Sequence, residues 1–151
     1  MKNIERSNSI DVPVSVAFAF VDDSSKVSDW MFGITRFEAI TNQTNGVGAT
    51  FTSAMAVGPK TFESTLKCTA WERDELITME SIAGTVCVTS WRFTALSDTQ
   101  TRVDMTFGYD LGGGLAGKAL AKIVEPAVAI AISSTENSLR SQVLAHHAAQ
   151  A

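Results

Sequence analysis

The chain has 151 residues, of which 45% are hydrophobic, enough for one domain with its own core over residues 1–151. With 12 Lys and Arg against 16 Asp and Glu, the formal charge is −4, and no segment combines clustered basic residues with aromatic ones. This pattern argues against a nucleic-acid-binding protein, so we expect no DNA or RNA partner.

The first third of the chain predicts one strand followed by two short helices. Asn3 to Ile10 alternates like an edge strand, and Asp11-Val12-Pro13 then has the carboxylate and proline of a helix start. Val14 to Val21 is the predicted helix. A polar break separates it from Lys26 to Phe32, a second helical segment that carries Trp30.

Six strand-like runs follow from Ile34 onward, which makes seven strands in all. The runs are short and closely spaced, which favours antiparallel hairpins, and a meander is the simplest topology. They are separated by the turn sequences Asn45-Gly46-Val47-Gly48, Gly58-Pro59, Arg73-Asp74-Glu75, Ala83-Gly84 and Ser97-Asp98-Thr99.

Alternation along these runs assigns side chains to the two faces of the predicted sheet. The clearest row lies in Thr101 to Leu111, where every second residue is apolar or aromatic, against Arg102 and Asp104 on the other face. The residues predicted to face inward are Phe62, Ser64, Leu66, Cys68 and Ala70, then Cys87, Thr89, Trp91, Phe93 and Ala95, and finally Val103, Met105, Phe107, Tyr109 and Leu111.

A long helix is predicted to close the chain, from Leu115 to about Leu144, after a hinge at Gly112-Gly113-Gly114. Pro126 removes a backbone donor and predicts a bend near Lys122. Lys and Glu within its first half argue against a membrane span. The apolar face is expected to contain Leu115, Ala116, Ala119, Leu120, Ile123, Val124, Ala127, Val128, Ala131, Leu139 and Val143.

The remaining chemistry-bearing residues give little sign of a metal or redox site. Cys68 and Cys87 lack metal-ligand spacing and fall on strands too far apart for a disulfide, so two free thiols are predicted. His146 and His147 are adjacent in an alanine-rich tail, where we expect frayed, solvent-exposed side chains. We predict no metal and no cofactor. The first residues lack the apolar core of a signal peptide, which predicts a cytoplasmic protein.

Several weak motifs in a fixed order resemble the START-like, or SRPBCC, superfamily, whose bacterial members include polyketide cyclase/dehydrase and lipid-transport proteins. The motifs are Ile10-Asp11-Val12-Pro13-Val14, Trp30, Gly46-Val47-Gly48-Ala49-Thr50-Phe51, Trp91-Arg92-Phe93, Asp98-Thr99-Gln100-Thr101-Arg102-Val103 and the terminal helix. The resemblance covers essentially the whole chain. It implies an α+β helix-grip fold, in which a seven-stranded curved antiparallel sheet surrounds the long C-terminal helix and two short helices follow strand 1.

Such a fold would hold an apolar cavity between sheet and helix, bordered at its mouth by the Trp30 segment. Family phasing would turn Thr78 and Glu80 inward, which makes Glu80 and Tyr109 the candidate catalytic residues and leaves Thr89 to orient a ligand. The full set of candidate ligand-binding residues is Trp30, Phe37, Phe51, Met55, Phe62, Leu66, Thr78, Thr89, Trp91, Met105, Phe107, Leu120, Val124 and Val128.

Two functions follow, and a third stays open. The first is binding of a small hydrophobic molecule that is lipid-, polyketide- or aromatic-like. The alternative is a cyclase or aromatase type of enzyme that acts on a poly-keto or aromatic substrate through Glu80, Tyr109 or Thr89. An interaction module for another protein is the third. We rank binding first because no inward acid-base pair is evident, and the sequence leaves monomer and homodimer equally open.

Overall fold

The computed structural model describes residues 2–150, which form one antiparallel sheet, three α-helices and a 3₁₀ turn. The elements in chain order are β1 (Lys2–Ile10), α1 (Val14–Asp22), the 3₁₀ turn η1 (Ser24–Lys26), α2 (Val27–Trp30), β2 (Ile34–Ala39), β3 (Thr50–Val57), β4 (Lys60–Glu72), β5 (Leu76–Gly84), β6 (Val86–Ser97), β7 (Gln100–Asp110) and α3 (Gly114–Gln150).

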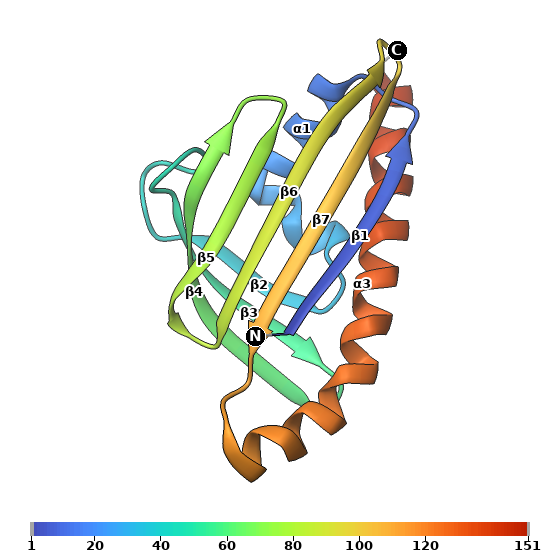
Figure 1. The fold of residues 1–151 in the computed structure, drawn as a ribbon. Helices are drawn as coiled ribbons and strands as arrows, with labels where there is room; N and C mark the ends of the chain where they lie inside the picture. The colour runs from blue at the N-terminus through green and yellow to red at the C-terminus, as the bar shows by residue number, and fades with distance from the viewer. Residues whose placement is uncertain (1, 151) are drawn as a thin grey trace.

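The sheet has the strand order β1-β7-β6-β5-β4-β3-β2, with every neighbouring pair antiparallel. The predicted meander is therefore correct from β2 to β7. The first strand adds to the last, with Ile4 opposite Phe107. The sheet curves, and α1, α2 and α3 cover its concave side, α3 running the length of β1 and β7 (Figure 1). The predicted α+β helix-grip class is confirmed.

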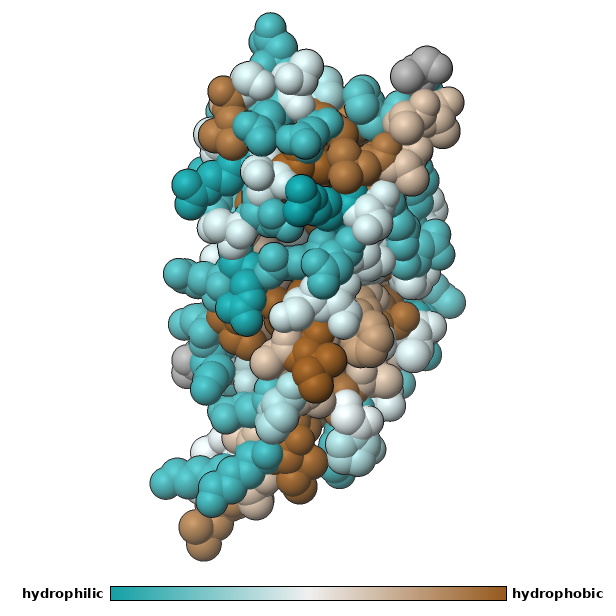
Figure 2. Space-filling view, turned by 90° about the vertical axis from the view of Figure 1, so that its right-hand side faces the viewer, coloured by the Kyte–Doolittle hydropathy of each residue, from teal (hydrophilic) through white to brown (hydrophobic). Residues whose placement is uncertain are grey.

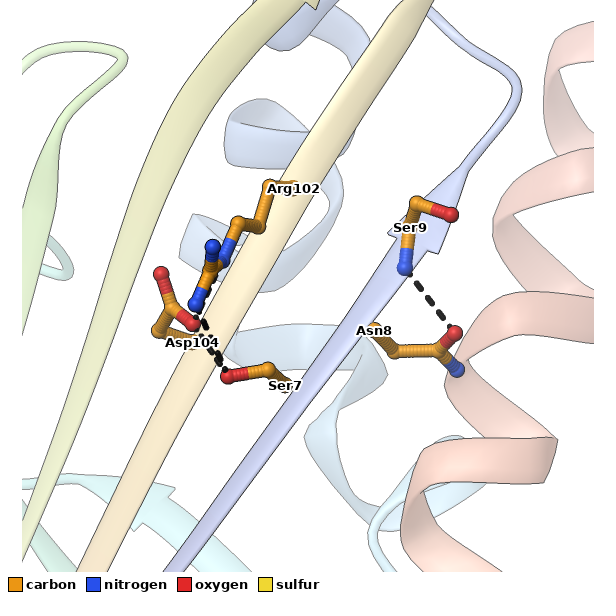
Figure 3. Close-up of polar contacts among 5 residues, drawn as sticks. All are labelled: Ser7, Asn8, Ser9, Arg102 and Asp104. Carbon is orange, nitrogen blue, oxygen red and sulfur yellow. Dashed lines mark hydrogen bonds and ion pairs between the residues drawn. The ribbon is translucent and has the colours of Figure 1, made fainter.

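On the outer face of the sheet, polar side chains of β1 and β7 contact each other (Figure 3). Asp104 accepts hydrogen bonds from the Ser7 hydroxyl and from Arg102 Nε, the latter at 2.9 Å. Although partial burial raises the pKa of Asp104, these hydrogen bonds and the charge of Arg102 outweigh burial and hold that pKa below its usual value. Because the folded pKa is lowered, this carboxylate favours the fold at neutral pH and loses that contribution as the pH falls through the acid range.

A bulge in β4 resets which side chains face inward. Cys68 lies opposite Met79, but Ala70 lies opposite Thr78, so the pairing gains one residue on β4 at that point. Beyond the bulge it is Trp71, not the predicted Ala70, that takes the inner face, opposite Ile77. Bulges of this kind leave no reliable mark in an alternation pattern.

The two short helices hold the concave side of the sheet. Phe18 of α1 makes edge-to-face contacts with Trp71 and Phe93, at ring-centroid distances of 5.6 and 5.3 Å. The start of α1 is fixed by Thr101, whose buried hydroxyl donates to the Val12 carbonyl oxygen at 2.8 Å. These contacts come from β4, β6 and β7, so three strands hold α1 in place.

The long helix α3 continues to Gln150, beyond the predicted end near Leu144. Its C-terminal part is packed instead of frayed, since the His146 ring lies 5.4 Å from Phe20. Pro126 lies within the helix, and Figure 1 shows α3 curving in its first part, as predicted. Within residues 2–150, no helix is long and apolar enough to cross a membrane.

The first turns of α3 extend past the end of the sheet, which corrects the predicted apolar face. Leu115 and Ile123 are 86% and 54% exposed, and Ala116 and Ala119 are exposed as well. Figure 2, which looks onto this side of the molecule, shows apolar surface in brown over its lower half. The apolar positions that do reach the core are Val124, Val128, Ala131, Leu139 and Val143.

Candidate functional site

A cavity lies between the concave face of the sheet and helices α2 and α3. Its volume is ≈160 Å³, counted as the space open to the centre of a water molecule, far above the roughly 10–15 Å³ that one water needs. Thirteen of the predicted residues line it: Trp30, Phe37, Phe51, Met55, Phe62, Leu66, Thr89, Trp91, Met105, Phe107, Tyr109, Val124 and Val128. The strand alternation that the sequence indicated therefore brings most of the candidate residues to one wall.

Three predicted residues do not line the cavity. In β5, Ile77 and Met79 line the cavity, opposite Trp91 and Thr89 of β6. The alternate residues Thr78 and Glu80 therefore point to the outer face. The prediction that Thr78 and Glu80 turn inward is thus wrong. Thr78 Oγ1 lies 3.0 Å from Ser90 Oγ, and Glu80 is exposed. Leu120 is partly buried against the core without reaching the cavity.

Trp30 belongs to the inner wall instead of the mouth. Its side chain is 1% exposed, and its ring meets that of Trp91 edge to face at 5.4 Å. The exposed aromatic residue of this segment is Phe32, which is 51% exposed, and its backbone N–H donates to Thr135 Oγ1 at 3.0 Å. This hydrogen bond ties the end of α2 to α3 beside the cavity.

Two buried polar atoms in the wall have no hydrogen-bond partner within the described residues, the indole Nε1 of Trp30 and the hydroxyl of Tyr109. Burial raises the pKa of Tyr109, the negative charge of Glu125 raises it further, and Lys2 opposes the change. The tyrosine hydroxyl therefore stays protonated near neutral pH and is available as a donor. Of the two predicted catalytic residues, only this one faces the cavity.

Asp22 is a cavity residue that the sequence analysis missed. It is the last residue of α1, and its carboxylate accepts from Trp71 Nε1 at 2.9 Å and from Asn45 Nδ2 at 3.0 Å. The partners lie 49 and 23 residues away along the chain, so no local pattern marks the site. Among the cavity-lining residues of the described chain, Asp22 is the one carboxylate, and none is Lys, Arg or His.

Both cysteines line the cavity as free thiols, as predicted. Burial raises the pKa of each thiol, and the hydrogen bonds to Ala70 for Cys68 and to Ser64 and Ser81 for Cys87 offset this only in part. We expect iodoacetamide at neutral pH to alkylate the folded protein much more slowly than the unfolded one, because the thiolate is the reactive form. Mass spectrometry after unfolding should count two alkylated thiols, and a non-reduced mass lower by two hydrogens would contradict the strand order.

The chemistry of the wall favours holding a molecule over transforming it. Over residues 2–150, no three His, Cys, Asp or Glu side chains are grouped so as to hold a metal ion. The carboxylate of Asp22 is already hydrogen-bonded to the protein, and its partners are an indole and an amide. What the cavity offers is apolar surface, shelter from water and two unpaired polar atoms.

Comparison with known proteins agrees with this geometry. The family model described as polyketide cyclase/dehydrase and lipid transport matches residues 1–142. No curated protein matches the sequence.

Several solved structures share the fold at low sequence identity. A protein from Thermus thermophilus is 18% identical with a TM-score of 0.81, and the match covers 96% of this chain and 99% of that one. The Zhui aromatase/cyclase from a Streptomyces species is 12% identical with a TM-score of 0.78, and the match covers 94% of this chain and 93% of that one. A START superfamily protein from Mycobacterium smegmatis is 9% identical with a TM-score of 0.75, covering 93% and 96%.

The family match spans nearly the whole chain, and the helix-grip architecture with its internal cavity is consistent with the fold of these structures. The chain therefore belongs to the polyketide cyclase/dehydrase and lipid transport family.

Proposed function

We propose that the protein binds a small, largely apolar molecule in the cavity between the sheet and α3. The observation that carries this proposal is the cavity itself. Protein interiors are normally packed to the density of organic crystals, so a space of ≈160 Å³ walled by aromatic and methionine side chains is costly unless something occupies it. The family description, which includes lipid transport, supports the same function.

The alternative, a cyclase or aromatase type of enzyme, has less support. Of the three residues named for it, Glu80 lies on the outer face of the sheet, whereas Tyr109 and Thr89 line the cavity. The likeness to the Streptomyces aromatase/cyclase, at 12% identity, bears on fold alone. General acid-base catalysis needs a proton donor and acceptor at the reacting atoms. Tyr109 is the unpaired cavity hydroxyl that could take either role, and its cross-strand neighbour in the wall, Cys87, is a thiol whose pKa is raised by burial.

Met105→Phe tests whether the cavity is a binding site. Met105 is 4% exposed and lines the cavity at the middle of β7. A phenylalanine should extend into free space, so we expect a loss of less than about 1.5 kcal/mol in the free energy of unfolding. The same ring should lower the uptake of Nile red, a neutral apolar dye. Urea denaturation and dye titration measure the two effects.

Thr106→Val provides the matched control, because Thr106 is the next residue on β7 and points to the opposite face. It should leave dye uptake unchanged. A loss of more than about 3 kcal/mol in Met105→Phe with dye uptake intact would show that Met105 is ordinary core and would refute the proposed site. Native mass spectrometry of protein purified from its own host would then identify the molecule that it carries.

A further inference from the structure

Two donors are buried in the cavity wall without partners. Trp30 is 1% exposed and Tyr109 is 6% exposed, and both side chains line the same cavity. The indole Nε1 and the phenol hydroxyl each lack a hydrogen-bond partner within the described residues. An unpaired buried donor costs about 1–3 kcal/mol, and the large majority of buried polar groups in proteins are paired. Two such groups in one cavity point to an occupant that supplies their partners.

The two donors restrict the chemistry of that occupant. An indole N–H can only donate, so the group beside Trp30 must be an acceptor. A tyrosine hydroxyl both donates and accepts, so a carbonyl, ether or hydroxyl oxygen would satisfy it. Each atom has almost no surface that water can reach, so a ligand oxygen can bond to either donor only when the ring that carries it turns toward the cavity.

The two donors lie at different levels of the cavity. The Trp30 ring contacts Trp91, and Trp91 lies opposite Met105 across β6 and β7. Tyr109 lies four residues further along β7, on the same face as Met105. Four residues of strand span roughly 13 Å between backbone positions. An occupant that meets both donors is therefore elongated, with its polar atoms separated.

The charges around the cavity favour a neutral occupant. Within the described chain, no lining residue is Lys, Arg or His, and the carboxylate of Asp22 already accepts from Trp71 and Asn45. The two charged side chains that act on the Tyr109 hydroxyl, Lys2 and Glu125, are paired with each other at 3.3 Å. A carboxylate on the ligand would lose its hydration without gaining a cation, which is strongly unfavourable.

We infer that the occupant is a neutral, elongated and mostly apolar molecule with oxygen acceptors at two separated points, one for Trp30 and one for Tyr109. This inference rests on the proposed function, since it concerns the ligand of the same cavity. It narrows the ligand class from hydrophobic molecules in general to oxygenated ones such as ketones, esters or alcohols. It also excludes free acids, fatty acids among them.

The test uses three probes of one shape with no, one or two acceptors: 2-ethylnaphthalene, 2-acetylnaphthalene and 2,6-diacetylnaphthalene. For the unaltered protein we expect dissociation constants, measured by quenching of tryptophan fluorescence or by calorimetry, to fall about 3- to 10-fold with each ketone. Tyr109→Phe and Trp30→Phe should each abolish the gain in affinity that one of the two ketones gives. Naphthalene-2-carboxylate should bind about tenfold or more weakly than 2-acetylnaphthalene.

Phe107→Leu is the matched control, because Phe107 stacks on Tyr109 at 5.6 Å and offers no donor. It should raise the dissociation constants of all three probes by the same factor and leave the ratios between them unchanged. Tyr109→Phe differs from the unaltered chain by a single hydroxyl, so it reports on binding even if Trp30→Phe fails to fold. Equal affinity for the three probes would overturn this inference alone. Absence of binding by every probe and by Nile red would overturn the proposed function as well.

Discussion

Trp30→Ala is expected to lower the free energy of unfolding by about 3–5 kcal/mol, the cost of removing a large buried aromatic side chain. Trp30 is 1% exposed, contacts Trp91 edge to face at 5.4 Å, and belongs to the main core cluster. The wall it forms already borders free space, so its removal would enlarge a cavity that the surrounding residues cannot fill by collapsing. Urea denaturation followed by far-UV circular dichroism measures the loss.

Phe32→Ala is the control for this substitution, because Phe32 lies two residues further on and is 51% exposed. It should cost less than about 1.5 kcal/mol, since half of its surface is already in water. Comparable losses for the two variants would mean that the α2 segment is not anchored through Trp30. A small loss for Trp30→Ala would refute the described packing of Trp30 on Trp91.

Gly84→Ala is expected to destabilise the protein by about 3–5 kcal/mol, through two separate terms. Gly84 has a φ of 79°, a conformation that costs an L-residue about 1–2 kcal/mol. An added Cβ would also overlap the Glu63 carbonyl oxygen and lie 2.9 Å from Ser64 Cα, and both of these atoms belong to the backbone of β4. The adjacent N–H of Thr85 donates to the same carbonyl at 3.0 Å, so this turn cannot move away without losing a hydrogen bond.

Gly112→Ala separates these two terms. Gly112 has a φ of 94°, but an added Cβ there would meet nothing within 4 Å. It should therefore cost about 1–2 kcal/mol, the conformational term alone. Thermal or urea denaturation of the pair gives the steric contribution at Gly84 by difference. Equal losses in the two variants would indicate that the packing of Gly84 against β4, at the end of the β4–β5 ladder, is looser than described.

The sequence was most informative where one physical effect acted without interruption. In β7, alternation continues from Val103 through Leu111, with no bulge, and the predicted inward row lies on the inner face. The turn sequences also separated the strands correctly, since glycine at positive φ stands at Gly46, Gly58 and Gly84. Both signals are local, so they can be recognised without knowing the rest of the fold.

The errors arose where a distant element decided the outcome. The prediction puts Thr78 and Glu80 on the wrong face of the sheet. Which side chains of β5 face inward is fixed by its pairing with the bulged strand β4 and with β6. Leu115 and Ile123 fit an apolar helix face, but the start of α3 lies past the end of the sheet and has nothing to cover. Asp22 became a cavity residue only through Trp71 and Asn45, which fold onto it from afar.

The pairing of β1 with β7 determines the order in which the molecule can assemble. Ile10 lies opposite Thr101, so this ladder joins segments separated by about ninety residues or more, whereas β2 to β7 are joined by successive hairpins. Closing a longer loop costs more chain entropy, and contacts between distant segments slow folding. We expect the hairpins to form early in refolding and β1 to dock late. During synthesis, the backbone N–H and C=O groups of β1 can form their ladder hydrogen bonds only after β7 has emerged from the ribosome.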